Sequence, residues 1–228
     1  MSFRLSYRAD PGNPWFSWQY LRDNSDTVIT AVREHASLTA RAVLIAALVA
    51  LPLAVVAYWF RSLAGPILAL TGVFYTIPSL ALFAFIAPYL GIGAATVLSV
   101  VVLYALLVIV RNAIAGFNQV PPEVREAAEG MGYGRWRRLF RIELPLALPG
   151  VLTGLRLATV STVALVTVGV VIGRGGLGQI IFAGFQNNFY KAQIMTGTLL
   201  CVLLALVLDL LLAGAGRLLT PWLRRGAG

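Results

Sequence analysis

Residues 62–110 read SLAGPILALTGVFYTIPSLALFAFIAPYLGIGAATVLSVVVLYALLVIV and contain no Asp, Glu, Lys, Arg or His. About 20 apolar residues are enough for a helix to cross a lipid bilayer, and no soluble core requires an uncharged run of this length. The run is too long for one crossing, and the turn-prone residues PYLGIG at 88–93 divide it. It therefore predicts two membrane spans, over residues 65–87 and 92–110.

The composition of the whole chain agrees with an integral membrane protein. Of its 228 residues, 59% are hydrophobic and 12% are charged, which is about half the charged fraction of an ordinary soluble domain. A single cysteine excludes an internal disulfide framework, and a single histidine excludes a histidine-cluster metal site. Because no dense grouping of His, Asp or Cys is present, we expect no catalytic residue and no metal site.

Three further apolar stretches, at 42–60, 149–172 and 194–216, bring the prediction to five transmembrane helices in an all-α polytopic fold. The formal net charge of the chain is +9, and much of the basic charge lies beside the apolar spans. This placement favours a role in membrane topology over the binding of nucleic acid.

The distribution of basic residues predicts the orientation in the membrane. Six arginines lie between residues 111 and 143, whereas the short loops on the other side hold only Arg174 and Lys191. The positive-inside rule then places the N-terminus outside and the C-terminus in the cytoplasm. The basic residues of the N-terminal tail oppose this orientation weakly.

The predicted layout has three parts: a polar tail over 1–37, a transmembrane domain over 38–220, and a cytoplasmic tail over 221–228. Part of the first tail is expected to lie on the membrane surface, with a loosely ordered leader as the alternative. The surface location rests on four aromatic side chains, which are Trp15, Phe16, Trp18 and Tyr20.

The cytoplasmic segment at 120–145 reads VPPEVREAAEGMGYGRWRRLFRIELP. It predicts two short helices separated by a turn, because strong helix formers at 126–129 precede three closely spaced glycines. The second helix is expected over 135–142, with Pro145 ending it before the next span. Neither helix has an apolar face large enough to fold alone, so the segment is expected to dock on a partner in the cytoplasm.

The same segment resembles the EAA signature, E-A-A-x3-G-x9-I-x-L-P, of the permease subunits of binding-protein-dependent type I ABC importers. In that family the loop is the coupling helix pair that sits in a groove of the ATP-binding subunit. The resemblance implies contact and turn roles for the matching residues, which are Glu126, Ala127, Ala128, Gly132, Ile142, Leu144 and Pro145.

Three other motifs look like those of osmoprotectant permeases, which import glycine betaine, choline, carnitine or related quaternary amines. They are YTIPSLAL at 75–82, GRGGLG at 173–178 and LDLLL at 208–212. Arg174 departs from that subfamily, which commonly has a small residue there in a loop facing the binding protein. The alternatives are a permease for methionine or another amino acid and, from a different class, a channel or membrane-embedded enzyme.

The chain contains no Gly-x-x-x-x-Gly-Lys-[Ser/Thr] phosphate loop, so ATP and Mg²⁺ are expected on a partner and no cofactor on this chain. The resemblance implies two ATP-binding subunits, a second permease chain that is identical or a sibling, and an extracytoplasmic substrate-binding protein. All would assemble at the bacterial cytoplasmic membrane, within the lipid bilayer and without nucleic acid.

Polar residues within the spans are candidates for the translocation path. Tyr75, Thr76, Pro78 and Ser79 interrupt an aliphatic stretch, where they either line a cavity or mark a helix kink. A tyrosine ring could offer its face to a quaternary cation. Ser161 and Thr162, together with Thr167, carry the same ambiguity, because small polar residues also pack helices together.

Arg156 and Asp209 are the two charges expected within spans. A charge inside a membrane normally has a partner. Arg156 lies about 16 Å along a helix from Pro145, and Asp209 about 12 Å before Arg217, so their depths are comparable. They are therefore predicted to pair near the cytoplasmic side, with separate snorkelling to the interface as the alternative.

Overall fold

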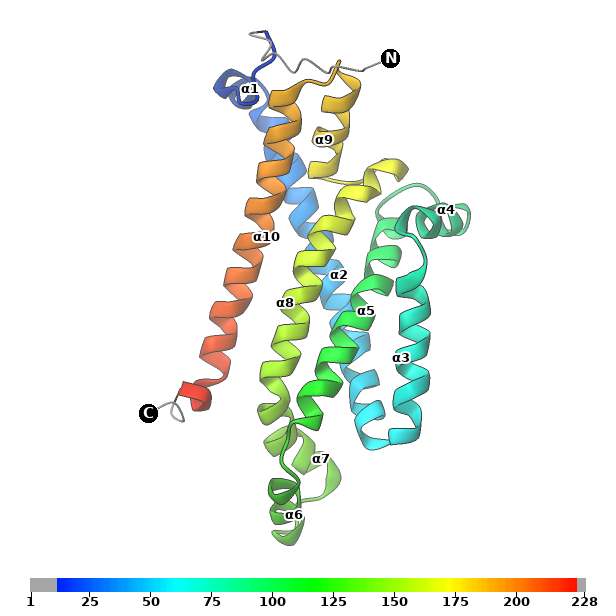
Figure 1. Ribbon diagram of the computed structural model, residues 1–228, viewed down its shortest axis with the longest axis vertical. Coiled ribbons are helices and arrows are strands. Elements are labelled where there is room, and N and C mark those ends of the chain that lie inside the picture. The colour runs from blue at the N-terminus through cyan, green and yellow to red at the C-terminus, as the bar shows by residue number, and fades with distance from the viewer. Residues whose placement is uncertain (1–11, 225–228) are drawn as a thin grey trace, which may run out of the picture.

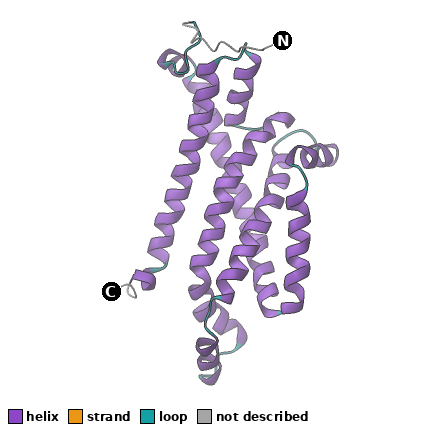
Figure 2. Cartoon of the chain, in the orientation of Figure 1, coloured by secondary structure: helices purple, strands orange, loops and turns teal. Residues whose placement is uncertain are grey.

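The computed structural model describes residues 12–224, and every regular element in that range is a helix (Figure 2). Long helices run side by side along one direction, and shorter ones lie at their ends (Figure 1). Residues 1–11 of the predicted first tail and 225–228 of the predicted last tail lie outside the described residues. The helices are α1 (Trp18–Asp23), α2 (Ser25–Trp59), α3 (Arg61–Thr76), α4 (Ser79–Leu90), α5 (Ala94–Asn118), α6 (Pro122–Gly130), α7 (Arg135–Arg138), the π turn η1 (Leu139–Glu143), α8 (Leu144–Val168), the 3₁₀ turn η2 (Gly169–Ile172), α9 (Leu177–Gln186), α10 (Lys191–Leu219) and the 3₁₀ turn η3 (Pro221–Arg224).

Four helical segments of the described chain are long and apolar enough to cross a membrane, and the bent pair α3–α4 raises the number to five. The four are α2, α5, the continuous segment Arg135–Ile172, and α10. The all-α polytopic fold with about five spans is therefore confirmed.

Helix α2 begins at Ser25, so the predicted boundary at residues 37/38 falls inside it. Its first half carries charges, and the hydropathy of that half alone predicts no span. One face is nevertheless buried, because Val28, Ala31, His35 and Leu38 recur every three or four residues. Helix α2 therefore extends beyond the N-terminal end of the apolar stretch at 42–60, and this added part is amphipathic.

Small residues form the contacts between the central helices α2, α5 and α8. Ala46, Ala50 and Ala54 of α2 are completely buried at four-residue intervals. Between α5 and α8, a Cβ atom added to Gly150 would lie 2.6 Å from the Cα atom of Gly116. The backbones therefore approach each other at distances that larger side chains would prevent.

The second predicted span, over 65–87, is wrong as a single helix. The chain turns by 94° between α3 and α4, and α4 lies sideways at the ends of α3 and α5 (Figure 1). Ile77 adopts an extended conformation with ψ of 128°, as expected for a residue whose helical conformation is disfavoured by the following Pro78.

The short loop expected between the last two spans, which holds Arg174 and Lys191, is also corrected, because it contains the apolar helix α9 (Leu177–Gln186). This helix packs beside α10 and lies at the same end of the bundle as α1 (Figure 1). Leu177 and Ile180 on α9 are buried against Val28 and Ala31 of α2. The sequence pattern does not predict this short amphipathic helix, because glycines and polar residues flank it on both sides.

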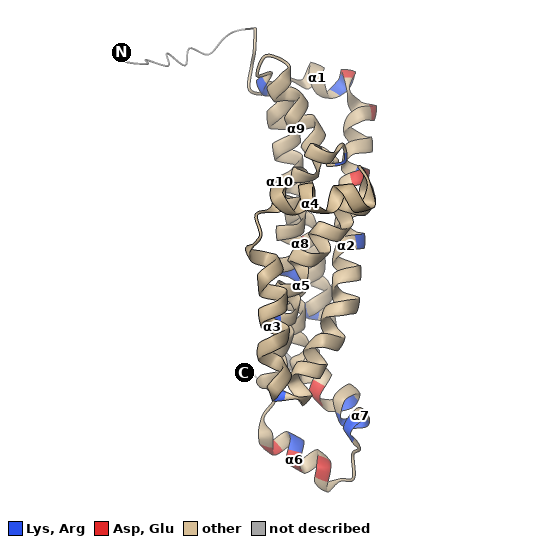
Figure 3. Ribbon diagram, turned by 90° about the vertical axis from the view of Figure 1, so that its right-hand side faces the viewer, with Lys and Arg blue, Asp and Glu red and all other residues tan. Residues whose placement is uncertain are grey.

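Helices α6 and α7 lie beyond the opposite end of the long helices. Figure 3 shows Lys, Arg, Asp and Glu gathered on these two helices. The described chain starts at the end that carries α1 and finishes, after α10, at the end that carries α6 (Figure 1). The arginine-rich helix pair therefore lies at one end of the bundle, and the other end carries charges of both signs on α1 and the first half of α2 (Figure 3).

Candidate functional site

Helix α6 ends in a Schellman motif at Gly132. The N–H of Gly132 donates to the carbonyl of Glu129 at 2.9 Å, and the N–H of Tyr133 donates to the carbonyl of Ala128 at 3.0 Å. Gly132 has a φ of +78°, in the left-handed region that glycine adopts without steric cost. The spacing between Ala128 and Gly132 in the signature is therefore that of a helix end and its glycine cap.

The three residues Glu126, Ala127 and Ala128 differ in burial. Glu126 and Ala127 are exposed, whereas Ala128 is completely buried. The exposed pair can contact a partner, and the buried alanine holds α6 against the rest of the chain. A hollow of about 300 Å³ lies beside them, bordered by Pro122, Arg125, Glu126, Glu129 and Arg138.

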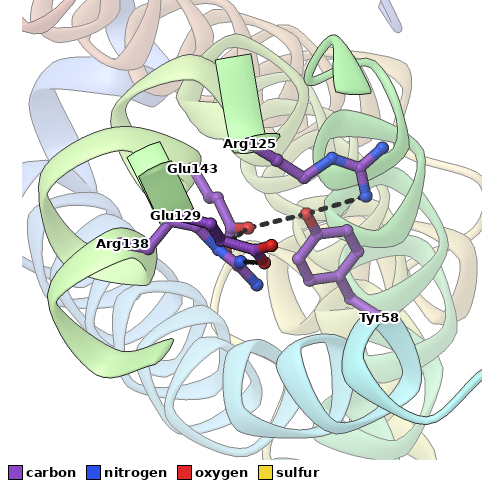
Figure 4. Close-up of polar contacts among 5 residues, drawn as sticks. All are labelled: Tyr58, Arg125, Glu129, Arg138 and Glu143. Atoms are coloured by element: carbon purple, nitrogen blue, oxygen red, sulfur yellow. Dashed lines mark hydrogen bonds and ion pairs between the residues drawn. The ribbon is translucent and has the colours of Figure 1, made fainter. Parts of the chain in front are cut away.

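A completely buried carboxylate, that of Glu143, connects this helix pair to the membrane spans. Its Oε1 atom accepts hydrogen bonds from Nε of Arg138 at 2.8 Å and from the hydroxyl of Tyr58 at 3.0 Å. Arg138 also forms an ion pair with Glu129 on α6 (Figure 4). One acid therefore holds together η1, α7 and the end of α2, and through Arg138 it reaches α6.

Arg125 makes a second connection between α6 and α2. Its Nη1 atom donates a long hydrogen bond of 3.5 Å to the hydroxyl of Tyr58, and its guanidinium lies 5.9 Å from the centre of that ring. The Tyr58 ring in turn stacks on Phe117 of α5 at 5.0 Å. A displacement of α6 therefore acts directly on residues of two spans.

The second signature half, Ile142, Leu144 and Pro145, lies where α7 passes into α8. The prediction that Pro145 ends the second helix is wrong, because helical structure is continuous from Arg135 to Ile172. Proline lacks a backbone N–H and crowds the carbonyl four residues earlier. The chain accommodates it with a π turn, in which Leu144 N–H bonds to the carbonyl of Leu139. Ile142, Leu144 and Pro145 are each half-buried in this junction.

The predicted path residues Tyr75, Thr76, Pro78 and Ser79 surround the break between α3 and α4. The Thr76 hydroxyl donates to the carbonyl of Val73 at 2.8 Å, and the carbonyl of Ile77 at the break accepts a hydrogen bond from Tyr104. These bonds fit the kink interpretation. The Tyr75 side chain is also 45% exposed, so its ring is available to a ligand at the corner.

Ser161 and Thr162 of α8 differ from that group. Thr162 is buried among the helices of this chain, which favours its alternative interpretation as a packing residue. Ser161 is half-buried and donates to the carbonyl of Ala158 at 3.0 Å. Thr167 makes a similar bond to Ala164 at 2.6 Å.

Arg156 and Asp209 are in direct contact between α8 and α10. Two hydrogen bonds of 2.8 Å join Nε to Oδ1 and Nη2 to Oδ2. The geometry is the bidentate arrangement in which Arg recognises a carboxylate. The sequence-based expectation of a pair, rather than two separately snorkelling charges, agrees with these contacts.

The family described as "Binding-protein-dependent transport system inner membrane component" matches residues 35–225 of this sequence. The chain belongs to this family. It is accordingly a permease subunit of a membrane transport system, and its matching relatives are named as transport permeases rather than enzymes.

Curated relatives cover most of this permease. It is 37% identical to the osmoprotectant import permease protein OsmW of Salmonella typhimurium, covering 89% of this chain and 96% of the relative. It is 35% identical to the choline transport system permease protein OpuBB of Bacillus subtilis, over 89% of this chain and 93% of that protein. The glycine betaine/carnitine/choline permease protein OpuCD of the same organism is also 35% identical, over 89% and 88%.

Solved structures support the permease fold. Inward-facing forms of the MetNI methionine ABC transporter match with TM-scores of 0.77 and 0.71. The matches cover 87% and 90% of this permease and 98% of each solved chain. Sequence identity in these comparisons is 21% and 23%, so they support the fold alone.

The glycine-rich stretch at 173–178 is packed against α2 and α8 in this permease. A Cβ atom on Gly176 would lie 2.7–2.8 Å from three atoms of His35, and Gly176 has a φ of +50°. His35 is completely buried, with Nδ1 accepting from the N–H of Leu177 at 3.3 Å and Nε2 lying 3.0 Å from the carbonyl of Val163. Arg174 extends from this stretch to Glu34 at 3.3 Å.

Glu143, Tyr58 and His35 are structural connections that the sequence alone does not predict. Glu143 occupies a variable position of the signature, and its signal is an acid at the start of an apolar helix, five residues after Arg138. Tyr58 belongs to an aromatic cluster that is typical of a membrane interface. The signal for His35 is its place among Val28, Ala31 and Leu38, small and apolar residues that recur at helical spacing.

Proposed function

We propose that this permease forms the translocation path of an ATP-driven importer for osmoprotectants such as glycine betaine, choline or carnitine. The observation that carries the proposal is the 35–37% identity to permeases named for these substrates, over 89% of this chain. The methionine alternative has weaker support, since MetNI shares the fold at 21–23% identity.

The proposed orientation places the α6 end in the cytoplasm and the α1 end outside a bacterial cytoplasmic membrane. The arginine-rich helix pair at one end (Figure 3) supports it. The exposed face of α6, including Glu126 and Ala127, would then contact an ATP-binding subunit that carries ATP and Mg²⁺. Two such subunits, a second permease chain and an external binding protein complete the proposed assembly.

In this proposal, movement of the ATP-binding subunits displaces α6. The Glu143 contacts pass that displacement to α2, and η1 passes it to α8 because the helix is continuous. The spans then tilt as rigid bodies and expose the path alternately to each side. At the α3–α4 corner, the exposed ring of Tyr75 offers its face to a quaternary ammonium group.

The experiment that tests the substrate is uptake into proteoliposomes containing the permease, its ATP-binding subunit and its binding protein. We expect ATP-dependent uptake of radiolabelled glycine betaine, choline or carnitine, with competition among these compounds and none by methionine. Uptake of methionine alone would establish the alternative permease function. Uptake without ATP would contradict an ATP-driven importer.

Gly132 provides a matched test of the coupling proposal. Replacing it by alanine forces a side chain into the left-handed region, at a cost of about 1–2 kcal/mol, and we expect lower transport per ATP hydrolysed. Gly134 is the control, because it has ordinary backbone angles and nothing within 4 Å of an added Cβ. Equal coupling in Gly132→Ala and Gly134→Ala would refute this role for the α6 cap.

A further inference from the structure

An apolar groove lies where α2, η1 and α8 meet, beside the charged helix pair. It has a volume of about 400 Å³, and its walls are almost entirely apolar. Along α2 the groove extends from Leu51 to Trp59, which is about 12 Å of helix. The lining residues are Leu51, Pro52, Val55, Val56, Trp59, Phe117, Trp136, Leu139, Phe140 and Leu144.

The groove crosses the level at which the membrane spans end. Leu51 and Val55 lie inside the long apolar helix α2, whereas Trp59 is its last residue. Trp136 meets Trp59 edge to face at 4.7 Å and is 61% exposed. Tryptophan is enriched at the boundary between hydrocarbon and headgroups, so one part of the groove faces acyl chains and its mouth faces the headgroup layer.

A positive charge is fixed at this mouth. The guanidinium of Arg135 lies 4.0 Å from the centre of the Trp59 ring and 5.0 Å from that of Phe60. Stacking on aromatic rings orients the cation without cancelling its charge. Among residues 12–224, no carboxylate forms an ion pair with Arg135, whereas Arg138 pairs with both Glu129 and Glu143.

We propose that this groove binds an anionic glycerophospholipid, with an acyl chain between α2 and η1 and the headgroup phosphate on Arg135. The occupant must be apolar at the depth of Leu51 and anionic at the level of Trp59, and a lipid combines these properties. A two-fold contact with an identical chain, centred on the groove, would instead bring the Arg135 side chains of both copies together, which repulsion opposes. The proposal does not depend on the transported substrate.

The test uses the full-length permease in its native assembly, reconstituted with equal amounts of phosphatidylglycerol and phosphatidylcholine. Native mass spectrometry then counts the lipids retained by each permease chain. We expect retained phosphatidylglycerol to exceed phosphatidylcholine roughly fivefold, the factor for one basic side chain near a lipid of net negative charge, because the choline group offsets the phosphate charge of phosphatidylcholine. Arg135→Gln should abolish this preference.

Two further variants distinguish the groove from general surface charge. Arg217→Gln removes an equal charge at the exposed end of α10, which does not line the groove, and should retain the preference. Val55→Trp should fill the groove and reduce bound phosphatidylglycerol with all arginines present. Unchanged retention in Arg135→Gln, equal loss in Arg217→Gln, or a second protein copy occupying the groove would each overturn the proposal.

Discussion

At the end formed by α6 and η1, a buried carboxylate and two arginines connect segments that are far apart in the sequence. At the opposite end, glycines bring a loop into contact with the backbone of α2 at His35. Ion pairs and side-chain hydrogen bonds can lengthen or exchange partners, whereas a backbone contact permits little displacement. The attachment of α6 and α7 to the spans, the coupling end, is therefore expected to be more mobile than the attachment of the glycine stretch 173–178 to α2, the stiff end.

The largest expected effect is at the stiff end. Gly176→Ala combines about 1–3 kcal/mol of backbone strain, because few residues other than glycine adopt φ +50° with ψ −117°, with overpacking of about 1–3 kcal/mol, since its Cβ would meet His35. We expect a loss of about 3 kcal/mol in the free energy of unfolding, measured as a lowered thermal midpoint in detergent. Gly65→Ala is the control, because nothing lies within 4 Å of its added Cβ. An equal decrease of the thermal midpoint in the two variants would show that the backbone contact at Gly176 does not stiffen this end.

At the coupling end, Glu143→Gln keeps hydrogen-bonding capacity but removes the charge that faces Arg138. Breaking a buried pair usually costs about 3–5 kcal/mol, and we expect about 2 kcal/mol because Glu129 still pairs with Arg138. Transport per ATP hydrolysed should fall as well, since α6 and α2 are no longer firmly linked. The control is the exposed acid Glu123, whose change to Gln should alter neither quantity. Full coupling in Glu143→Gln would show that the acid serves folding alone.

Tyr58→Phe removes one donor from the same carboxylate and retains the ring stacked on Phe117. The expected loss of stability is about 1 kcal/mol, the usual net value of one hydrogen bond. Its coupling defect should be smaller than that of Glu143→Gln and absent from Tyr89→Phe, a change at a residue that is 77% exposed. A double variant of Tyr58 and Glu143 should lose less than the sum, because the two residues share one contact.

The smallest effect is expected for the ion pair of the stiff end. Arg174 and Glu34 are partly exposed, with side-chain accessibilities of 57% and 22%, and such pairs contribute about 0–1 kcal/mol. Arg174→Gln should therefore change the thermal midpoint little, with or without added salt. A salt-dependent loss above 1 kcal/mol would show that this end depends on charge too.

The sequence predicts the parts of the molecule that depend on local pattern. Uncharged runs locate the spans, and the spacing of Ala128 and Gly132 locates the cap of α6. It does not predict the position of the α3–α4 break, because both Pro78 and Pro88-Tyr89 are plausible turns. The break at Pro78 is accompanied by tertiary contacts, including the hydrogen bond from Tyr104 to the carbonyl of Ile77. The charged first half of α2 is missed because burial of its other face depends on α9.

The site shows the same division. The signature alone does not show which residues of α6 are exposed and which end the helix. The fold is needed to assign these roles. The contacts of Glu143 with Tyr58 join residues 85 positions apart, and no local pattern encodes that distance. Arg156 and Asp209 were accessible to prediction because a charge within a span is rare and requires a partner.

The uninterrupted helix from Arg135 to Ile172 has a mechanical consequence. Its 38 residues make a rod about 57 Å long. A tilt of about 5° about one end would move the other by about 5 Å, close to one helical turn. The Ile172 end adjoins the glycine stretch that is packed against His35, so we expect the helix to pivot at that end. The largest displacement would then occur at the Arg135 end.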